Sequence, residues 1–182
     1  MLRYGLDAAD PRRAALHLRA TGALDAGGER DVAAGISVRP LRDVPVVLAG
    51  EVRAVDGPFG RDVRPAAFVV AAPPPTRLGA GFDLSAYAQG GYVAGRAETA
   101  FVDGQARIAR NVAAGGTARL DAGAGVWGGA QRGASRLDIG PSAALTAAVG
   151  EVPVRLQVDY RIRVAGDARP ASGPAVTLAA GF

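Results

Sequence analysis

The chain has 182 residues with 26 glycines, 12 prolines and no cysteine, and its formal net charge is +4. This length suits a single domain, and the glycine and proline content favours many turns over long helices, while the absence of cysteine excludes disulfides and thiolate metal sites. No apolar run approaches the ~20 residues of a transmembrane helix, and the positive charge comes from single arginines interspersed with acids, which argues against a nucleic-acid partner.

Apolar and polar residues alternate along much of the chain, which predicts β-strands because successive side chains on a strand point to opposite faces. We expect about twelve strands in one domain over residues 1–182, with a count between about 10 and 14. In chain order the strands are expected at Leu2 to Leu6, Ala15 to Leu24, Val32 to Arg39, Val46 to Val55, Ala66 to Ala72, Leu78 to Ala88, Tyr92 to Val102, Ala106 to Ala113, Thr117 to Trp127, Ser135 to Ala147, Val154 to Val164 and Val176 to Phe182.

Glycine-containing pairs and runs mark the expected turns. Asp103-Gly104 is the strongest short hairpin signal, because both central positions of the favoured turn require a positive φ. Further turns are expected at Gln89-Gly90-Gly91, at Gly115-Gly116, over Gly128 to Gly133 and at Gly150-Glu151.

The clearest alternation runs from Val154 to Val164. Its even positions are all apolar, whereas its odd positions carry Gln157 and four charged residues. Two architectures fit such a strand. In a soluble sandwich or barrel the apolar face points inward, and in a membrane barrel it points outward into lipid.

Three features favour the membrane barrel. Acids and arginines share one face within single strands, as Arg119 does with Asp121; the later strands reach the roughly 9–11 residues that span a bilayer; and the chain ends on Phe182 after an alternating segment. Aromatic residues make up only 5% of the chain, which is thin for two interfacial girdles. The predicted fold is therefore all-β, an antiparallel transmembrane-type β-barrel.

Two sets of residues follow from this prediction, one for each face of the sheet. The first is a charged ladder facing the lumen, in which most acids lie within two residues of an arginine on the same face and so neutralise it. Its members are Arg96, Glu98, Arg119, Asp121, Arg136, Asp138, Arg155, Asp159, Arg161 and Arg163. The second set faces lipid and comprises Leu137, Ile139, Val154, Leu156, Val158, Tyr160, Ile162, Val176, Leu178 and Phe182.

No catalytic residue, cofactor or metal site is predicted. His17 is the single histidine, and spacing identifies neither a nucleophile nor an orienting group for it. The glycine-rich stretches lack the lysine and helix of a phosphate loop. Asp138 is expected near Arg161 or Arg163 across the hairpin at Gly150-Glu151, with the register open by one step.

Several segments resemble the C-terminal domain of the outer-membrane bacteriophage adsorption protein A family. They are Arg136 to Ser142, Asp159 to Pro174, Ser37 to Asp43 and the region from Tyr92 to Arg110, so the resemblance covers most of the chain from about Glu29 onward. All are turn and strand patterns without a catalytic centre.

This resemblance implies a non-enzymatic barrel in the bacterial outer membrane, the C-terminal part of a longer protein, which acts as anchor or conduit in exopolysaccharide export and as a phage receptor. The implied partners are outer-membrane lipid, polysaccharide or phage at loops that include Ala165 to Gly173, and the barrel-assembly machinery at the C-terminal strand. The N-terminal residues show no signal peptide.

Two further hypotheses remain open. One is a soluble β-barrel or sandwich that binds a small apolar ligand inside. The other is a membrane-embedded acyl-transfer enzyme or lipase that uses His17 and a nearby serine.

Overall fold

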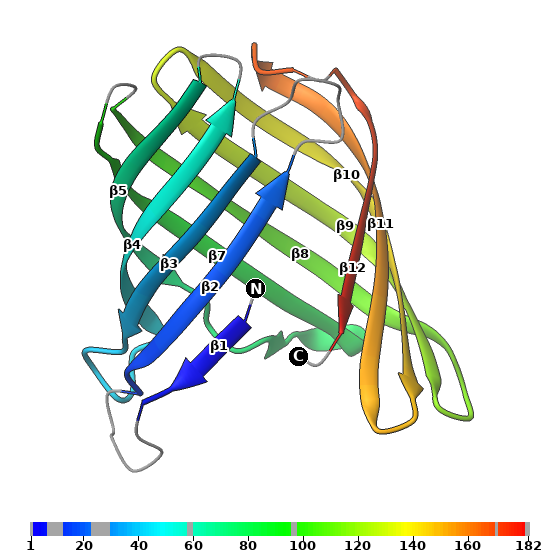
Figure 1. Cartoon of the computed structure of the whole chain (residues 1–182). Coiled ribbons are helices and arrows are strands. Elements are labelled where there is room, and N and C mark those ends of the chain that lie inside the picture. Colours follow the sequence, from blue (N-terminus) through cyan, green and yellow to red (C-terminus); the bar gives the residue numbers. More distant parts are fainter. Residues whose placement is uncertain are drawn as a thin grey trace. The chain divides into compact units, whose positions relative to one another are not determined.

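The computed structural model describes residues 2–6, 13–22, 30–57, 60–95, 98–169 and 171–180. Strands account for almost all of this part of the chain, as the alternation of apolar and polar residues predicts (Figure 1). Their bounds are β1 Leu2–Gly5, β2 Ala15–Gly22, β3 Arg30–Val38, β4 Val46–Gly57, β5 Gly60–Ala71, β6 Thr76–Arg77, β7 Phe82–Val93, β8 Thr99–Gly115, β9 Ala118–Gln131, β10 Ala134–Val149, β11 Val152–Gly166 and β12 Gly173–Ala180.

These strands form one antiparallel sheet in which neighbours in the sequence are neighbours in space. The order is β1-β2-β3-β4-β5-β7-β8-β9-β10-β11-β12, and the two-residue β6 pairs with β7 beside this path. The predicted all-β antiparallel fold and the number of strands are confirmed. Among the described residues, β1 and β12 each have a partner strand on one side only, so the sheet is not closed into the predicted barrel.

The chain divides into two compact units, which we describe separately. Unit 1 comprises Met1–Pro73 and Ala88–Val102, and unit 2 comprises Pro74–Tyr87 and Asp103–Phe182. Unit 1 contains β1 to β5 with the end of β7 and the start of β8. Unit 2 contains β6, the start of β7, most of β8, and β9 to β12.

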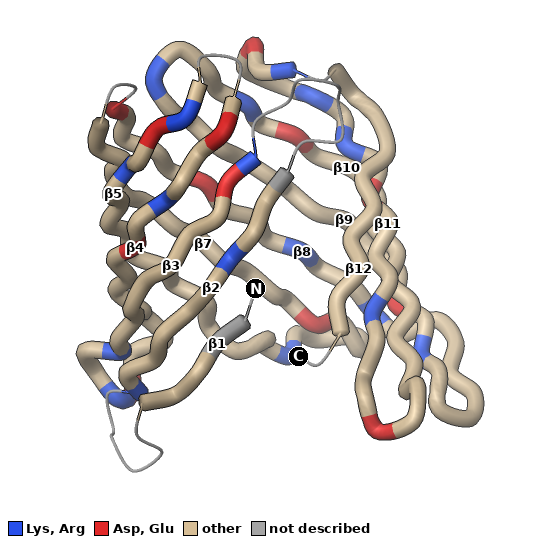
Figure 2. Tube along the Cα trace, viewed as in Figure 1, with Lys and Arg blue, Asp and Glu red and all other residues tan. Residues whose placement is uncertain are grey.

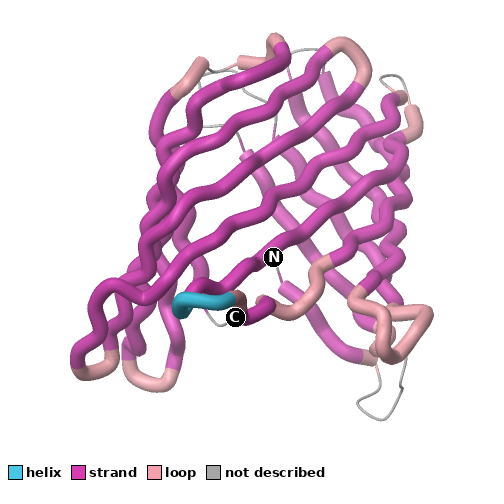
Figure 3. The backbone as a smooth tube through the Cα atoms, turned by 180° about the vertical axis from the view of Figure 1, so that it is seen from behind, coloured by secondary structure: helices cyan, strands magenta, loops and turns pink. Residues whose placement is uncertain are grey.

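Glycines with a positive φ mark where the strands turn, because this backbone region is costly for residues that carry a Cβ. The two-residue turns between β8 and β9, β9 and β10, and β10 and β11 contain Gly116, Gly133 and Gly150, whose φ angles are +56°, +76° and +64°. The prediction at Gly150-Glu151 is confirmed. The prediction over Gly128 to Gly133 is too wide, because β9 continues through Gln131 before the chain turns (Figure 3).

The predicted turn at Gln89-Gly90-Gly91 is wrong, since these residues lie inside β7 and pair with Val70, Val69 and Phe68 of β5. A Cβ on Gly91 would meet the carbonyl oxygen of Ala67 at 2.4 Å, so this glycine permits close strand packing rather than a change of direction. The chain turns instead after Val93, where Gly95 has a φ of +111°.

The hairpin predicted at Asp103-Gly104 is also wrong, and with it the separate strands from Tyr92 to Val102 and from Ala106 to Ala113. Both residues lie inside β8, which runs unbroken from Thr99 to Gly115. The Asp103 carboxylate is engaged by the phenol of Tyr87, which donates a 2.9 Å hydrogen bond to it. A cross-strand contact therefore holds Asp103 in extended backbone.

The strand predicted to begin at Leu78 begins later, because a short 3-10 turn at Gly79–Gly81 precedes β7 (Figure 3). Ala80 and Gly81 have φ angles of +58° and +77°, which lie outside the range of extended strand backbone. The strand predicted from Ala66 is longer than expected and starts at Gly60. No helix in the described residues is long and apolar enough to cross a membrane.

Candidate functional site

The two faces of the sheet differ in exposure, and the difference is opposite to that of a water-soluble sheet. Along β11 the apolar side chains of Leu156, Val158, Tyr160 and Ile162 are exposed, Tyr160 by 50%, whereas Asp159 is 0% exposed. We call the less exposed face of each unit its charged face and the other its apolar face. From Arg155 to Val164 of β11, exposure alternates with the strand period residue by residue.

The residues predicted to face lipid lie on the apolar face wherever the structure describes them. All are exposed except Val154, which is half-buried, and Leu178 reaches 71%. Phe182 lies outside the described residues. The exposed members are Leu137, Ile139, Leu156, Val158, Tyr160, Ile162, Val176 and Leu178.

Most of the residues predicted to form a charged ladder lie on the charged face of unit 2. The carboxylates of Asp121, Asp138 and Asp159 are buried. Four arginines beside them are half-buried, namely Arg136, Arg155, Arg161 and Arg163. A fifth, Arg119, is exposed.

Two members of the predicted ladder are not among these residues. Glu98 is exposed just before β8, where its carboxylate accepts a 2.6 Å hydrogen bond from the phenol of Tyr92. Arg96 lies outside the described residues. Figure 2 shows acidic and basic positions beside one another on neighbouring strands.

Asp159 is the centre of the network in unit 2. Ser142 of β10 donates to its Oδ1 at 2.5 Å, and the Gln157 side chain donates to both oxygens, at 3.1 and 2.9 Å. Arg107 of β8 in turn donates from Nε to the Ser142 hydroxyl at 2.9 Å, and the Arg161 guanidinium lies 3.8 Å from Asp159 Oδ2. One fully buried carboxylate thus accepts hydrogen bonds from β10 and β11 and is linked through the Ser142 hydroxyl to β8.

Trp127 of β9, the one tryptophan of the chain, lies on the same face, opposite Asp138 of β10. Its ring is 4% exposed and lies beneath the guanidinium of Arg161, which is 4.9 Å from the ring centroid. A Cβ on Gly125 would stand 2.5 Å from the ring, so the absence of a side chain at Gly125 leaves room for the indole. The contact with Arg161 is of the cation–π kind.

Arginine–aspartate pairs occur at both ends of these strands. Arg119 Nε donates to Asp121 at 2.7 Å, and Arg136 Nε donates to Asp138 at 2.5 Å. Asp138 is directly opposite Arg163 in the β10–β11 ladder, which confirms the expectation that it lies near Arg161 or Arg163. A register shift between Leu137 and Asp138 brings this pair into alignment.

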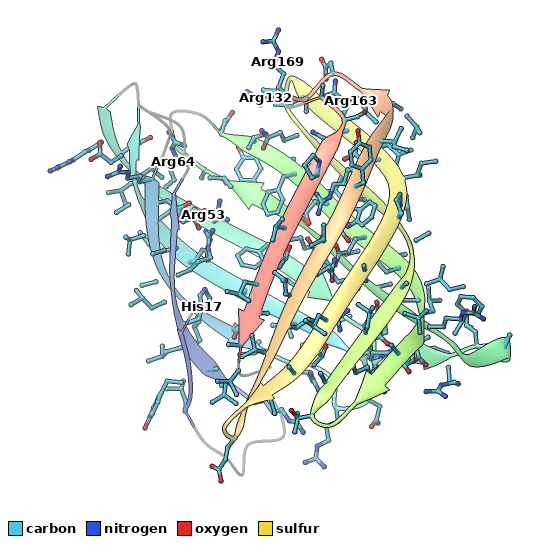
Figure 4. All side chains as sticks on the ribbon, turned by 90° about the vertical axis from the view of Figure 1, so that its right-hand side faces the viewer. His17, Arg53, Arg64, Arg132, Arg163 and Arg169 are labelled. Carbon is cyan, nitrogen blue, oxygen red and sulfur yellow. The ribbon has the colours of Figure 1, made fainter. Side chains whose placement is uncertain are left out.

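Unit 1 contains a second buried cluster, centred on Glu51 of β4. Its Oε2 is 3.2 Å from Nε2 of His17, and its Oε1 accepts from Arg19 at 3.1 Å and from Arg53 at 2.5 Å. His17 and Glu51 are on β2 and β4, and each is paired with Gly35 of the intervening β3. Because Gly35 has no side chain, the imidazole and the carboxylate meet across it. Figure 4 labels His17 and Arg53 on their strands.

Several of these residues escaped the sequence prediction. Alternation places Ser142 and Gln157 on the charged face, but neither was included in the predicted ladder. Arg107 and Trp127 were not assigned to that face, since their relation to Asp159 depends on the register of separate strands. Glu51 and its pairing with His17 were missed for the same reason.

In both clusters arginine side chains neutralise the buried carboxylates and hold them in position. In the described residues the side-chain partner of His17 is a carboxylate held by two arginines, and no group of three histidine, cysteine, aspartate or glutamate residues could hold a metal ion. Comparison of the chain with protein-family models, with curated proteins and with solved structures finds no match.

Proposed function

We propose that the chain is the membrane-spanning part of a bacterial outer-membrane β-barrel, without enzymatic activity, which serves as anchor or conduit in exopolysaccharide export and as a surface for phage adsorption. The membrane part of this proposal rests on the exposure of the two faces, and the cellular role rests on the resemblance of the strand and turn segments described above.

The observation that carries the proposal is that large apolar side chains cover the exposed face while carboxylates and guanidiniums are buried on the other. Monomeric soluble proteins rarely expose contiguous apolar patches larger than a few hundred Å². In a bilayer the same face is solvated by lipid tails, and lumen-facing positions are polar. A soluble barrel with an apolar ligand inside would require the opposite assignment of faces on β11.

Strand length supports the same conclusion. β8, β9, β10 and β11 have 17, 14, 16 and 15 residues, whereas about 9–11 tilted residues suffice to cross a bilayer. These strands are thus long enough to span the hydrocarbon and to project beyond it. Two-residue turns lie at both ends of unit 2, at Gly116 and Gly150 on one end and at Gly133 on the other, so turn length does not distinguish the two ends.

The sheet edges set a requirement on the proposed barrel. An unpaired backbone N–H or C=O costs several kcal/mol in hydrocarbon, so spanning sheets are closed. The free edge of β1 and the free edge of β12 each need a partner strand in the membrane. Strand pairing at these edges is therefore part of the proposal.

The test is a pair of substitutions at adjacent positions of β11. Leu156→Arg places a charge on the apolar face and should abolish insertion into lipid vesicles, since arginine near the bilayer midplane costs roughly 2–4 kcal/mol. Arg155→Leu, its matched control, changes the charged face and should insert nearly as well as the unaltered chain. Insertion is measured by protection from added protease. Equal insertion of both variants would show that the assignment of faces is wrong.

A further inference from the structure

Arg110 of β8 interrupts the apolar face of unit 2. Its neighbours on the same face of the strand, Ile108 and Val112, are apolar and are 39% and 48% exposed. Arg110 is exposed as well, and alternate residues of a strand share a face. Its side chain therefore leaves the sheet on the side that meets lipid in the proposed barrel.

Arg110 has no charged companion on this face. Strand pairing assigns the even positions of β9, β11 and β12 and the odd positions of β10 to the apolar face. Among the described residues of these strands, none of those positions has a charged residue, and the even positions of β8 contain no other one. The sequence thus places one cation on a face that is otherwise uncharged from β8 to β12.

The guanidinium of Arg110 is held by an aromatic ring and not by a carboxylate. Its Cζ lies 5.6 Å from the centroid of the Phe82 ring. In the part of the chain that the structure describes, no ion pair or hydrogen bond joins its side chain to another residue. A cation–π contact forms no N–H···O bond, so the five donors of the guanidinium remain available for an anion.

This contact lies toward one end of the strands that form it. Phe82 is the first residue of β7, directly after the 3-10 turn at Gly79–Gly81, and Arg110 is in the last third of β8. Arginine on the lipid face of a barrel is costly at the bilayer midplane and nearly neutral at the interface, and its long side chain can extend the charge toward the headgroups. The place of Arg110 near a strand end therefore fits the interface, where the lipid phosphates lie.

We propose that Arg110 binds the phosphate group of a membrane lipid, with the Phe82 ring holding the guanidinium in place. This inference rests on the proposed function, in which the apolar face is in lipid. The planar guanidinium donates two parallel hydrogen bonds to a phosphate, and it also stacks on aromatic faces. A lipid headgroup thus supplies the anion that the neighbouring strands do not.

The test compares two micelles, of dodecylphosphocholine, whose headgroup contains a phosphate, and of dodecyl maltoside, whose headgroup does not. The measurement is solvent exchange of the Arg110 Nε–H group by nuclear magnetic resonance, with the signal identified by its loss in Arg110→Gln. We expect exchange to be about tenfold slower in dodecylphosphocholine, because a hydrogen bond to a charged group protects the donor. Arg107 is the matched control on the same strand, since its Nε donates to Ser142 and should exchange equally in both micelles.

Two further samples identify the anion and the role of the ring. Inorganic phosphate added to the dodecyl maltoside micelles should leave exchange of Arg110 fast, and protection by this free ion would overturn the assignment to a lipid. Phe82→Leu in dodecylphosphocholine should lose part of the protection, and unchanged protection would overturn the role of the ring.

Equal exchange of Arg110 in both micelles, with the Arg107 signal present in each, would overturn the phosphate contact and leave the proposed barrel standing. A chain that folds in neither micelle would instead contradict the proposed function, and the lipid contact with it.

Discussion

Gly35 shows how a residue without a side chain can position two others. A Cβ at Gly35 would stand 2.3 Å from the carbonyl oxygen of Gly50 and 2.7 Å from Cβ of Glu51, so there is no room for one. The gap lets His17 and Glu51 meet across β3. Burial of Glu51 without the donors that surround it would be costly, because an unpaired buried charge destabilises a fold.

Gly35→Ala should therefore lower the stability of unit 1 markedly, by about 2 kcal/mol or more, since strain in a packed backbone adds to the loss of the His17–Glu51 contact. Gly50→Ala is the matched control on the neighbouring strand, where an added Cβ would meet nothing closer than the Ala66 carbonyl at 4.0 Å. The measurement is the urea midpoint by circular dichroism in micelles. Similar midpoints for both variants would contradict the role given to Gly35.

Gly125 has the corresponding role for Trp127 in unit 2. Gly125→Ala would place a Cβ 2.5 Å from the indole and 3.1 Å from Cγ of Arg107, so the ring must leave its place. We expect a red shift of the fluorescence, which is unambiguous because the chain has one tryptophan. Gly128→Ala, with its nearest contact at 3.5 Å, should leave the emission maximum where it is. Identical spectra would show that the indole does not depend on Gly125.

Asp159 is predicted to be the most sensitive carboxylate of the charged face. Asp159→Asn removes the charge that faces Arg161 and replaces one of the two oxygens that accept from Ser142 and Gln157 with an NH2 donor, and it should destabilise the protein by about 3–5 kcal/mol, as expected when one member of a buried pair is lost. Glu151→Gln, in an exposed turn, should be within about 0.5 kcal/mol of the unaltered chain. Both values come from urea unfolding, and equal losses would refute the central position of Asp159.

At the scale of elements, the sequence predicts strands well where alternation is unbroken. β10, β11 and β12 begin or end within a few residues of the expected positions, because strict period-two patterning is a local signal. The region between Gly79 and Gly115 was divided wrongly. There the dipeptides Gly90-Gly91 and Asp103-Gly104 resemble turns, yet pairing with β5 and the bond from Tyr87 keep them extended.

The charged face could be predicted only in outline. Alternation assigns Asp121, Asp138 and Asp159 to one face, and all three are buried there. The bonds that join Arg107, Ser142 and Asp159 could not be predicted, since they depend on register between strands that are far apart in sequence. The contribution of Gly35 depends likewise on which residues stand on either side of it across the sheet.

At the scale of the whole molecule, the sheet contains twelve strands, and its ends at β1 and β12 are free among the described residues. An exposed edge is a template for pairing with another strand, and a bilayer does not tolerate it. The proposed barrel therefore depends on both edges acquiring partners in lipid or detergent. In a closed sheet every strand is hydrogen-bonded on both sides, so no unpaired edge N–H or C=O group is exposed to a denaturing detergent.

The most direct test of this central claim is gel mobility of the chain in dodecyl sulfate, unboiled against boiled, after refolding into micelles. We predict that the unboiled protein migrates as a compact species and that boiling converts it to the slower unfolded form, because a closed sheet resists the detergent at room temperature. The same mobility with and without boiling, for a protein that is folded and soluble in plain buffer, would contradict the account.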